Sequence, residues 1–385
     1  MDDTNPRLAT RLAFLTAGFT MACWAPLVPF AKARIGADDR LLGLLLLGLG
    51  IGSLIAMPLT GWLSAQSGSK PMIIGGGLGM CVLLPLLATA DSALVLAVAL
   101  VGFGASLGTL DVAMNIHAVE VERQAGRHLM SGFHAMFSLG GILGAGAMTL
   151  LLSLGVTPLA ASLGAAALGL VAIGIASPRF LPARGTPTPL VAPHGAVMLL
   201  AGLCAISFLV EGAMLDWGAL LVIGKRLVDA AHGGLGYMLF SIAMTIGRLT
   251  GDRLVARLGD GRVLLWGGLT TIAGFALLLT APVAALAMAG FLLIGLGAAN
   301  IVPVLFRQAG NQTVMPVGLA VAAITTTAYA GVLAGPAAVG FVSRAFSLPT
   351  AFWLLAALWS LIPLCARWIT TPPADRSAAR APRRA

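Results

Sequence analysis

Long apolar segments separated by short polar stretches run along the whole chain. Twelve of them reach the length of roughly 20 residues that a helix needs to cross a bilayer. They cover residues 8–30, 41–63, 72–90, 94–119, 129–153, 157–177, 195–224, 235–256, 262–280, 283–306, 316–343 and 349–370. Barrel strands alternate in polarity and are about half as long. The pattern therefore predicts an all-α polytopic membrane protein with twelve transmembrane helices.

Composition supports a membrane protein and excludes several other classes. The 385 residues are 58% hydrophobic and 10% charged, whereas soluble domains carry about 25% charged residues. The four cysteines show no spacing typical of a metal site or a disulfide framework. No phosphate-binding loop or catalytic constellation is present. We expect no enzyme activity and no cofactor, with a proton gradient as the energy source.

Basic residues predict the orientation of the chain. Most of the 23 lysines and arginines fall in segments that are cytoplasmic if the N-terminus is inside. Both termini are then cytoplasmic, and a bacterial inner membrane is the expected location. The net charge of +9 follows from this topology and not from binding to nucleic acid. We expect the tail residues Arg376, Arg380, Arg383 and Arg384 to lie against anionic lipid.

The chain also reads as two related halves. A Pro-rich stretch at 177–189 cannot continue a helix. The predicted domains are an N-terminal six-helix bundle (1–177), a cytoplasmic linker (178–194), a C-terminal six-helix bundle (195–372) and a basic tail (373–385). Short motifs recur between the halves: Leu59-Thr60-Gly61 as Leu249-Thr250-Gly251, and Arg123-Gln124-Ala125-Gly126 as Arg307-Gln308-Ala309-Gly310. Asn115 then matches Asn300, which supports a 6+6 repeat.

Asp111 is the most informative candidate for function. It lies within the apolar segment 94–119, where a carboxylate costs about 2.5–3.5 kcal/mol on insertion scales. Asn115 follows four residues later and shares its helix face. A carboxylate beside an amide can hold a proton and a polar solute, so we predict proton coupling at Asp111 and substrate binding at Asn115. The alternative is a hydrogen bond that only holds helices together.

Two further carboxylates occupy the segment 195–224. Glu211 lies near its middle and is a second candidate for proton coupling. The alternative is a buried carboxylate paired with a basic or amide group. Asp216 is about 140° away around the helix, and we interpret it as a gate or a structural partner.

Other polar and aromatic residues are candidates for substrate binding. Trp24 sits among small residues in the middle of the first segment, where it can offer a flat wall to a solute or fill the core. His134 exchanges protons near neutral pH and can line a cavity or pack. Asn300 is the repeat partner of Asn115. His117 is on the opposite face from Asn115, where we expect packing.

Charged residues at the ends of two helices are candidates for gating. Glu122 and Arg123 end the fourth segment, and Arg248, Asp252, Arg253 and Arg257 mark the turn after the eighth. These residues are either solvated helix ends or ion pairs that break as the halves rock.

The pattern of spans and repeats resembles the major facilitator superfamily. The stretch from Gly61 to Lys70 is similar to the loop signature of that family, although Ala65 and Gln66 replace its usual Asp and Arg. Leu110–Asn115, Phe133–Gly141 and Glu211–Trp217 are similar to the fucose–galactose–gluconate:proton symporter group and its bacterial relatives. The resemblance implies that the carboxylate at Asp111 takes part in proton and sugar handling. A helix 1 carboxylate of that group is absent, because Ala25 stands in its place.

These observations predict a secondary transporter that works by alternating access as a monomer. The favoured function is proton-coupled symport of a small polar solute, a sugar or sugar acid. The alternative is proton-driven efflux of amphipathic or toxic compounds, which the small number of charges and the missing helix 1 carboxylate favour. A third hypothesis is a non-transporting membrane sensor on the same fold.

Overall fold

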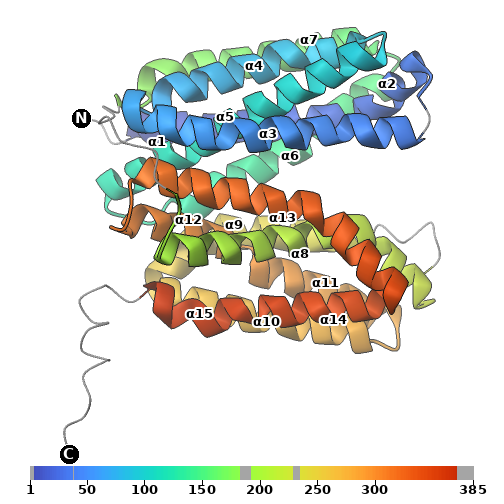
Figure 1. The fold of residues 1–385 in the computed structure, drawn as a ribbon, viewed down its shortest axis with the longest axis vertical. Helices are drawn as coiled ribbons and strands as arrows, with labels where there is room; N and C mark the ends of the chain where they lie inside the picture. Colours follow the sequence, from blue (N-terminus) through green and yellow to red (C-terminus); the bar gives the residue numbers. More distant parts are fainter. Residues whose placement is uncertain (1–3, 38, 183–191, 229–234, 371–385) are drawn as a thin grey trace, which may run out of the picture. The chain divides into compact units, whose positions relative to one another are not determined.

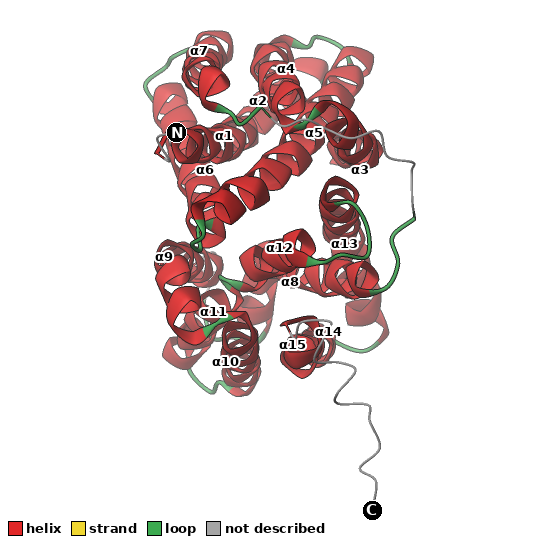
Figure 2. Ribbon diagram, turned by 90° about the vertical axis from the view of Figure 1, so that its left-hand side faces the viewer, coloured by secondary structure: helices red, strands yellow, loops and turns green. Residues whose placement is uncertain are grey.

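The computed structural model describes residues 4–37, 39–182, 192–228 and 235–370, and every regular element in these ranges is a helix (Figures 1 and 2). The elements in chain order are α1 (Thr4–Trp24), η1 (Ala25–Leu27), α2 (Val28–Ile35), α3 (Asp39–Ser67), α4 (Ser69–Thr89), α5 (Ala93–Ala125), α6 (Met130–Ser153), α7 (Pro158–Ala176), η2 (Ser177–Arg179), α8 (Ala196–Gly224), α9 (Leu235–Leu258), α10 (Asp260–Thr280), α11 (Ala284–Ala298), α12 (Ile301–Asn311), α13 (Val317–Ala345), α14 (Leu348–Trp359) and α15 (Leu361–Thr370). The tail residues predicted to bind lipid lie outside the described ranges.

These helices form the twelve predicted segments. In the described part of the chain, eleven segments are long and apolar enough to cross a membrane. The twelfth is α9, a continuous 24-residue helix. Its hydropathy is lower because Arg248, Asp252, Arg253 and Arg257 lie within it. The prediction of an all-α polytopic membrane protein is confirmed.

Proline explains two interruptions within spans. The first span contains η1 between α1 and α2, and Pro26 stands at the start of that short helix. The tenth span breaks at Ala299 and Asn300, between α11 and α12. Pro303 has no backbone N–H to donate to the carbonyl four residues earlier, which is that of Ala299. The break therefore exposes a carbonyl that needs another donor.

The chain divides into two compact units. One holds the residues up to Ala205 together with Ala309–Ala334, and the other holds Ile206–Gln308 together with the residues from Gly335 onward. Parts of α8, α12 and α13 thus belong to each unit. The predicted bundle boundaries at 177 and 195 stay predictions.

Glycine allows close packing in the first unit, where α1 contacts α6 and α7, α3 contacts α5, and α4 contacts α5 and α7. Gly140 and Gly144 of α6 face the backbone carbonyls of Leu15 and Phe19 in α1, with no room for a Cβ atom. Close backbone approach of this kind is the usual way in which membrane helices gain contact area. It holds α1 against α6, and both helices contact α5.

In the second unit, α10 packs against α11 and α15, and α9 packs against α11. Gly295 of α11 lies directly against the carbonyl of Phe240 in α9. Lys225, just beyond α8, donates hydrogen bonds to the carbonyls of Leu278 and Leu279 at the end of α10. A cation at a helix C-terminus satisfies carbonyls that have no partner within the helix. The Gly295 contact thus brings α11 close to α9, and the Lys225 bonds tie the end of α8 to α10.

Candidate functional site

Asp111 is buried within α5 of the first unit, and its partners are neutral. The side-chain Nδ2 of Asn115 donates hydrogen bonds to the Asp111 carboxylate at 3.0 Å and to its backbone carbonyl at 2.9 Å. The Tyr329 hydroxyl group of α13 also forms a hydrogen bond with the carboxyl group. Among the described residues, no basic side chain pairs with Asp111. Asp111 and Asn115, which were predicted to share a helix face, are therefore hydrogen-bonded to each other, and Tyr329 joins them.

A small apolar cluster shares Tyr329 with this group. Met57 of α3, Val112 of α5 and Ala322 of α13 are buried against one another, and Ile116 and Tyr329 pack on them. The buried Asp111 carboxyl group thus has hydrogen bonds with Asn115 and Tyr329, and Tyr329 packs on apolar side chains. A charge in such a setting is poorly solvated.

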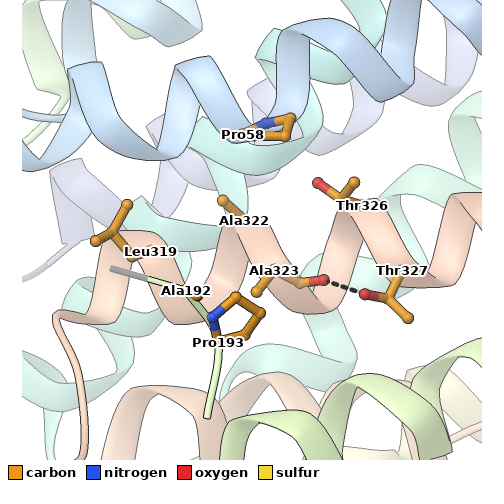
Figure 3. Close-up of a pocket in the computed structure, with 8 residues that line it drawn as sticks. All are labelled: Pro58, Ala192, Pro193, Leu319, Ala322, Ala323, Thr326 and Thr327. Atoms are coloured by element: carbon orange, nitrogen blue, oxygen red, sulfur yellow. Dashed lines mark hydrogen bonds between the residues drawn. The ribbon is translucent and has the colours of Figure 1, made fainter. Parts of the chain in front are cut away.

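A pocket of about 340 Å³ lies beside this cluster (Figure 3). It shares Ala322 with the cluster and is lined by Pro58, Ala192, Pro193, Leu319, Ala322, Ala323, Thr326 and Thr327. Thr327 donates its hydroxyl hydrogen to the carbonyl of Ala323, which leaves the hydroxyl group of Thr326 as the polar group without a protein partner in the described structure. The lining is mostly apolar and includes none of the predicted substrate residues.

The second unit holds a separate polar cluster on α8 and α9. The Arg248 guanidinium Nη2 lies 3.5 Å from Glu211 Oε1, and both side chains are largely enclosed, with 10% and 24% of their surface exposed. Arg248 lies inside α9 and not at the turn that follows it, and its role in gating stays a prediction. The two charges pair because a carboxylate and a guanidinium within the membrane each need a counterion.

The break between α11 and α12 completes this cluster. Arg248 Nε donates a hydrogen bond to the carbonyl of Ala299 at 3.3 Å, the same carbonyl that Pro303 leaves without a donor. Asn300 Nδ2 donates to the carbonyl of Gly247 at 3.0 Å. Two adjacent residues of α9 thus bond with two adjacent residues of the break.

Sequence reasoning missed the two tyrosines. The chain has only two, and each lies near a predicted proton-coupling carboxylate. Tyr329 is bonded to Asp111, and Tyr237 of α9 interacts electrostatically with Glu211, Arg248 and Asp216. The rarity of tyrosine in so apolar a chain was the available signal.

Two predicted substrate residues lie in packed positions. Trp24 is buried at the end of α1. His134 stands edge-on to Phe14, with ring centroids 5.2 Å apart. Their roles in substrate binding stay predictions.

His117 packs, as its helix face suggested. The Leu181 backbone N–H donates to its Nε2, so the proton of a neutral ring is on Nδ1, 3.0 Å from the Thr10 hydroxyl oxygen. That hydroxyl in turn donates to the carbonyl of Pro6. This chain of bonds ties α1 and α5 to the segment after η2.

Glu122 and Arg123 are in different surroundings. Glu122 is buried, and its Oε2 accepts the backbone N–H groups of Leu129 and Met130 at 2.6 and 2.8 Å. It therefore caps the start of α6. Arg123 is exposed and lies 3.6 Å from Glu120 in the same helix. The structure thus gives Glu122 a structural contact, and gating by this pair stays a prediction.

The other predicted gating residues lie along α8 and α9. Arg253 and Arg257 are exposed on the last turns of α9, Asp252 is half-buried, and Asp216 is exposed on α8. A different group, missed from the sequence, lies in this unit. Asp260, in the first turn of α10, binds Arg307 at 2.5 Å and Gln308 at 2.6 Å, both on α12. Arg307 and Gln308 are the repeat counterparts of Arg123 and Gln124.

Known proteins place the chain in a family, although no protein-family model matches it. It is 50% identical over 369 residues to an uncharacterised MFS-type transporter of Yersinia pestis, covering 95% of this chain and 96% of that protein. It is 34% identical over 374 residues to an uncharacterised transporter of Sinorhizobium fredii, covering 94% and 97%.

A solved structure agrees with these relatives. The fucose:proton symporter FucP of Escherichia coli matches with a TM-score of 0.77 at 19% identity, over 95% of this chain and 98% of that one. At this identity the likeness concerns the fold alone. The resemblance noted from the sequence is confirmed. Because the identity to an MFS-type transporter extends along almost the whole chain, this protein belongs to the major facilitator superfamily and is an integral membrane transporter, not an enzyme.

Proposed function

We propose that the protein couples the movement of protons to uptake of a small polar solute, a sugar or sugar acid. The observation that carries the proposal is the environment of Asp111. The residue is 9% exposed and lies within a membrane helix. Its carboxyl group has the neutral partners Asn115 and Tyr329. A charge in this position can be balanced by a proton, and an ionisable group in a span is a functional candidate for that reason.

Comparison with Glu211 supports this assignment. Glu211 has a counterion in Arg248, so its charge is balanced within the protein. Asp111 has none among the described residues, and its net charge changes when it binds a proton. Moving a bare charge through the membrane interior is costly. The transporter then reorients with Asp111 protonated, and the proton is released on the cytoplasmic side.

The remaining features of the proposal follow from topology and charge. Both termini face the cytoplasm of a bacterial inner membrane, the proton gradient supplies the energy, and the monomer is the working unit. Asn115 binds the solute beside the proton site, since its Oδ1 has no hydrogen-bond partner in the described structure.

The test is uptake into proteoliposomes with and without an inward proton gradient. Asp111→Asn keeps the size and hydrogen bonding of the side chain but cannot carry a proton. We expect it to abolish accumulation driven by the gradient while exchange without a gradient persists. Asp91→Asn, an exposed residue before α5, is the matched control and behaves as the wild type. Gradient-driven accumulation by Asp111→Asn would refute the role of Asp111.

A second candidate function is proton-driven efflux of amphipathic compounds. The pocket beside α13 favours it, because six of its eight lining residues are Pro, Ala or Leu (Figure 3). Efflux predicts that inverted vesicles take up lipophilic cations when a proton gradient is imposed, and that right-side-out vesicles do not accumulate sugars or sugar acids. The opposite result favours symport.

A further inference from the structure

Helices α3 and α13 of the first unit contact each other at two glycines, and a proline stands between these glycines in α3. A Cβ atom on Gly61 of α3 would meet the side chain of Ala322, and one on Gly50 would meet the side chain of Leu333. Pro58 lies inside α3 between the two glycines. A proline within a helix leaves one carbonyl without its donor, and its ring clashes with the preceding turn. The pocket of about 340 Å³ borders this proline (Figure 3).

The lining of the pocket is neutral, and one of its hydroxyl groups lacks a partner. None of the eight lining residues is ionisable. The Thr327 hydroxyl group donates to the carbonyl of Ala323 at 2.7 Å, whereas the buried Thr326 hydroxyl group has no hydrogen bond in the described structure. Figure 3 shows Ala322 and Thr326 on the side of α13 that faces Pro58. An enclosed hydroxyl group without a partner costs free energy, which a bound molecule recovers by forming a hydrogen bond with it.

The exposed face of α3 gives the pocket a route to the lipid. Pro58 is exposed, and so are its neighbours Ile55 and Leu59, at 68% and 52%. Apolar side chains on the exposed face of a spanning helix meet the hydrocarbon of the bilayer. A molecule dissolved in that hydrocarbon can therefore reach the pocket at Pro58.

We propose that this pocket binds a neutral, single-chain molecule with one hydroxyl group, such as a medium-chain alcohol. The chain lies against Pro58, Leu319 and Ala323. Its hydroxyl group bonds with that of Thr326, which can donate or accept. An apolar cavity of about 150 Å³ holds benzene, so a pocket of about 340 Å³ has room for a chain of about ten carbon atoms.

Charge distinguishes this ligand from other amphipathic molecules. No lining residue can balance a charged head group, and burying an unpaired charge is costly. The inference goes beyond the proposed symport, because Asp111 and Asn115 do not line the pocket and binding needs no proton gradient. For the efflux candidate, it narrows the amphipathic compounds at this pocket to neutral ones.

The test is photolabelling of the full-length protein in proteoliposomes, which retain the hydrocarbon that supplies the ligand. The probe is a diazirine analogue of 1-decanol, and mass spectrometry identifies the labelled peptides. We expect saturable labelling of the peptides that contain Pro58 and Leu319–Thr327. Unlabelled 1-decanol should compete with the probe. Decane, which lacks the hydroxyl group, and the charged decyl sulfate and decyltrimethylammonium should compete more weakly at equal concentration in the membrane.

Variants separate the hydroxyl group from the apolar space. Thr326→Val should weaken competition by 1-decanol by about five- to tenfold, the loss of one hydrogen bond, and leave competition by decane unchanged. Its melting temperature should not fall, because no hydrogen bond within the protein is lost. Thr325→Val is the matched control, since that hydroxyl group bonds to the carbonyl of Val321 and does not line the pocket. Ala323→Phe fills the pocket and should abolish saturable labelling.

Three results would overturn the inference. The first is labelling that does not saturate or that spreads evenly over the spans. The second is equal competition by decane and 1-decanol in the wild type. The third is an equal effect of Thr326→Val and Thr325→Val, or labelling of the same peptides that survives Ala323→Phe.

Lipid analysis identifies the source of the natural ligand. A neutral single-chain lipid that copurifies with the wild type, and not with Ala323→Phe, supports the inference with a membrane component as the ligand. Saturable decanol labelling without such a lipid supports it with a solute that enters the membrane from outside.

Discussion

Asn115 and Asn300 occupy matching positions in the two repeats, and each donates its side-chain Nδ2 to a backbone carbonyl. Asn115 bonds at 2.9 Å to Asp111 in its own helix, whereas Asn300 bonds at 3.0 Å to Gly247 in a neighbouring helix. Each amide is left with an Oδ1 that has no partner among the described residues. Both asparagines thus have a free acceptor oxygen, but their surroundings differ. The surroundings include a carboxyl group in one unit and an arginine in the other.

Tyr329 should tune transport without being needed for folding. Tyr329→Phe removes the hydroxyl group bonded to Asp111 and keeps the ring packed against the cluster of Met57, Val112 and Ala322. We expect a melting temperature within a few degrees of the wild type, because one hydrogen bond contributes about 1 kcal/mol. The pH profile of proton-driven uptake should move. A profile identical to that of the wild type would show that Tyr329 has no influence on the proton site.

The losses of stability caused by replacing Glu211 and Arg248 should not be additive. Either single change, Glu211→Gln or Arg248→Gln, leaves one largely enclosed charge without its counterion, which typically costs about 3–5 kcal/mol. The double variant removes both charges and should recover much of the loss. Thermal unfolding of all four proteins gives the coupling energy. Additive losses would contradict a direct ion pair.

Glu122 should behave as a helix cap. Glu122→Ala removes the acceptor of the Leu129 and Met130 N–H groups and should destabilise the protein by about 1–2 kcal/mol. Glu122→Gln keeps an acceptor oxygen and should lose less. If Glu122 only caps α6, transport per folded molecule is the same in both variants. A transport defect in the stable Gln variant would instead support the predicted gating role.

The contact between α1 and α6 should depend on Gly140 but not on its neighbour. Gly140→Ala brings a Cβ atom onto the Leu15 backbone carbonyl, and Gly141 has open space at the same position. Overpacking of this kind typically costs about 1–3 kcal/mol, whereas Gly141→Ala should be neutral or stabilising by up to about 1 kcal/mol. The melting temperatures of the two variants test this. Equal values would indicate that α1 shifts to accept the methyl group.

The sequence alone determined the membrane-spanning helices and the contact between Asp111 and Asn115. Spans can be read locally, since a run of about 20 apolar residues is stable in lipid whatever its neighbours are. The Asp111–Asn115 bond follows from helix geometry, which places residues four apart on one face. The twelve segments and this bond were therefore predictable from residues close together in the chain.

Only the tertiary structure decided which helices supply the partners of the acidic residues Asp111, Glu211 and Asp260. Tyr329 at Asp111, Arg248 at Glu211 and Arg307 at Asp260 each join different helices. Such pairs depend on the rotation and depth of one helix against another. Helices that are apolar on all sides have no amphipathic face to specify that rotation; it is set by backbone contacts such as those of Gly140 and Gly295. For this reason the sequence did not show the partners of Arg248, which the structure places beside Glu211 and the carbonyl of Ala299.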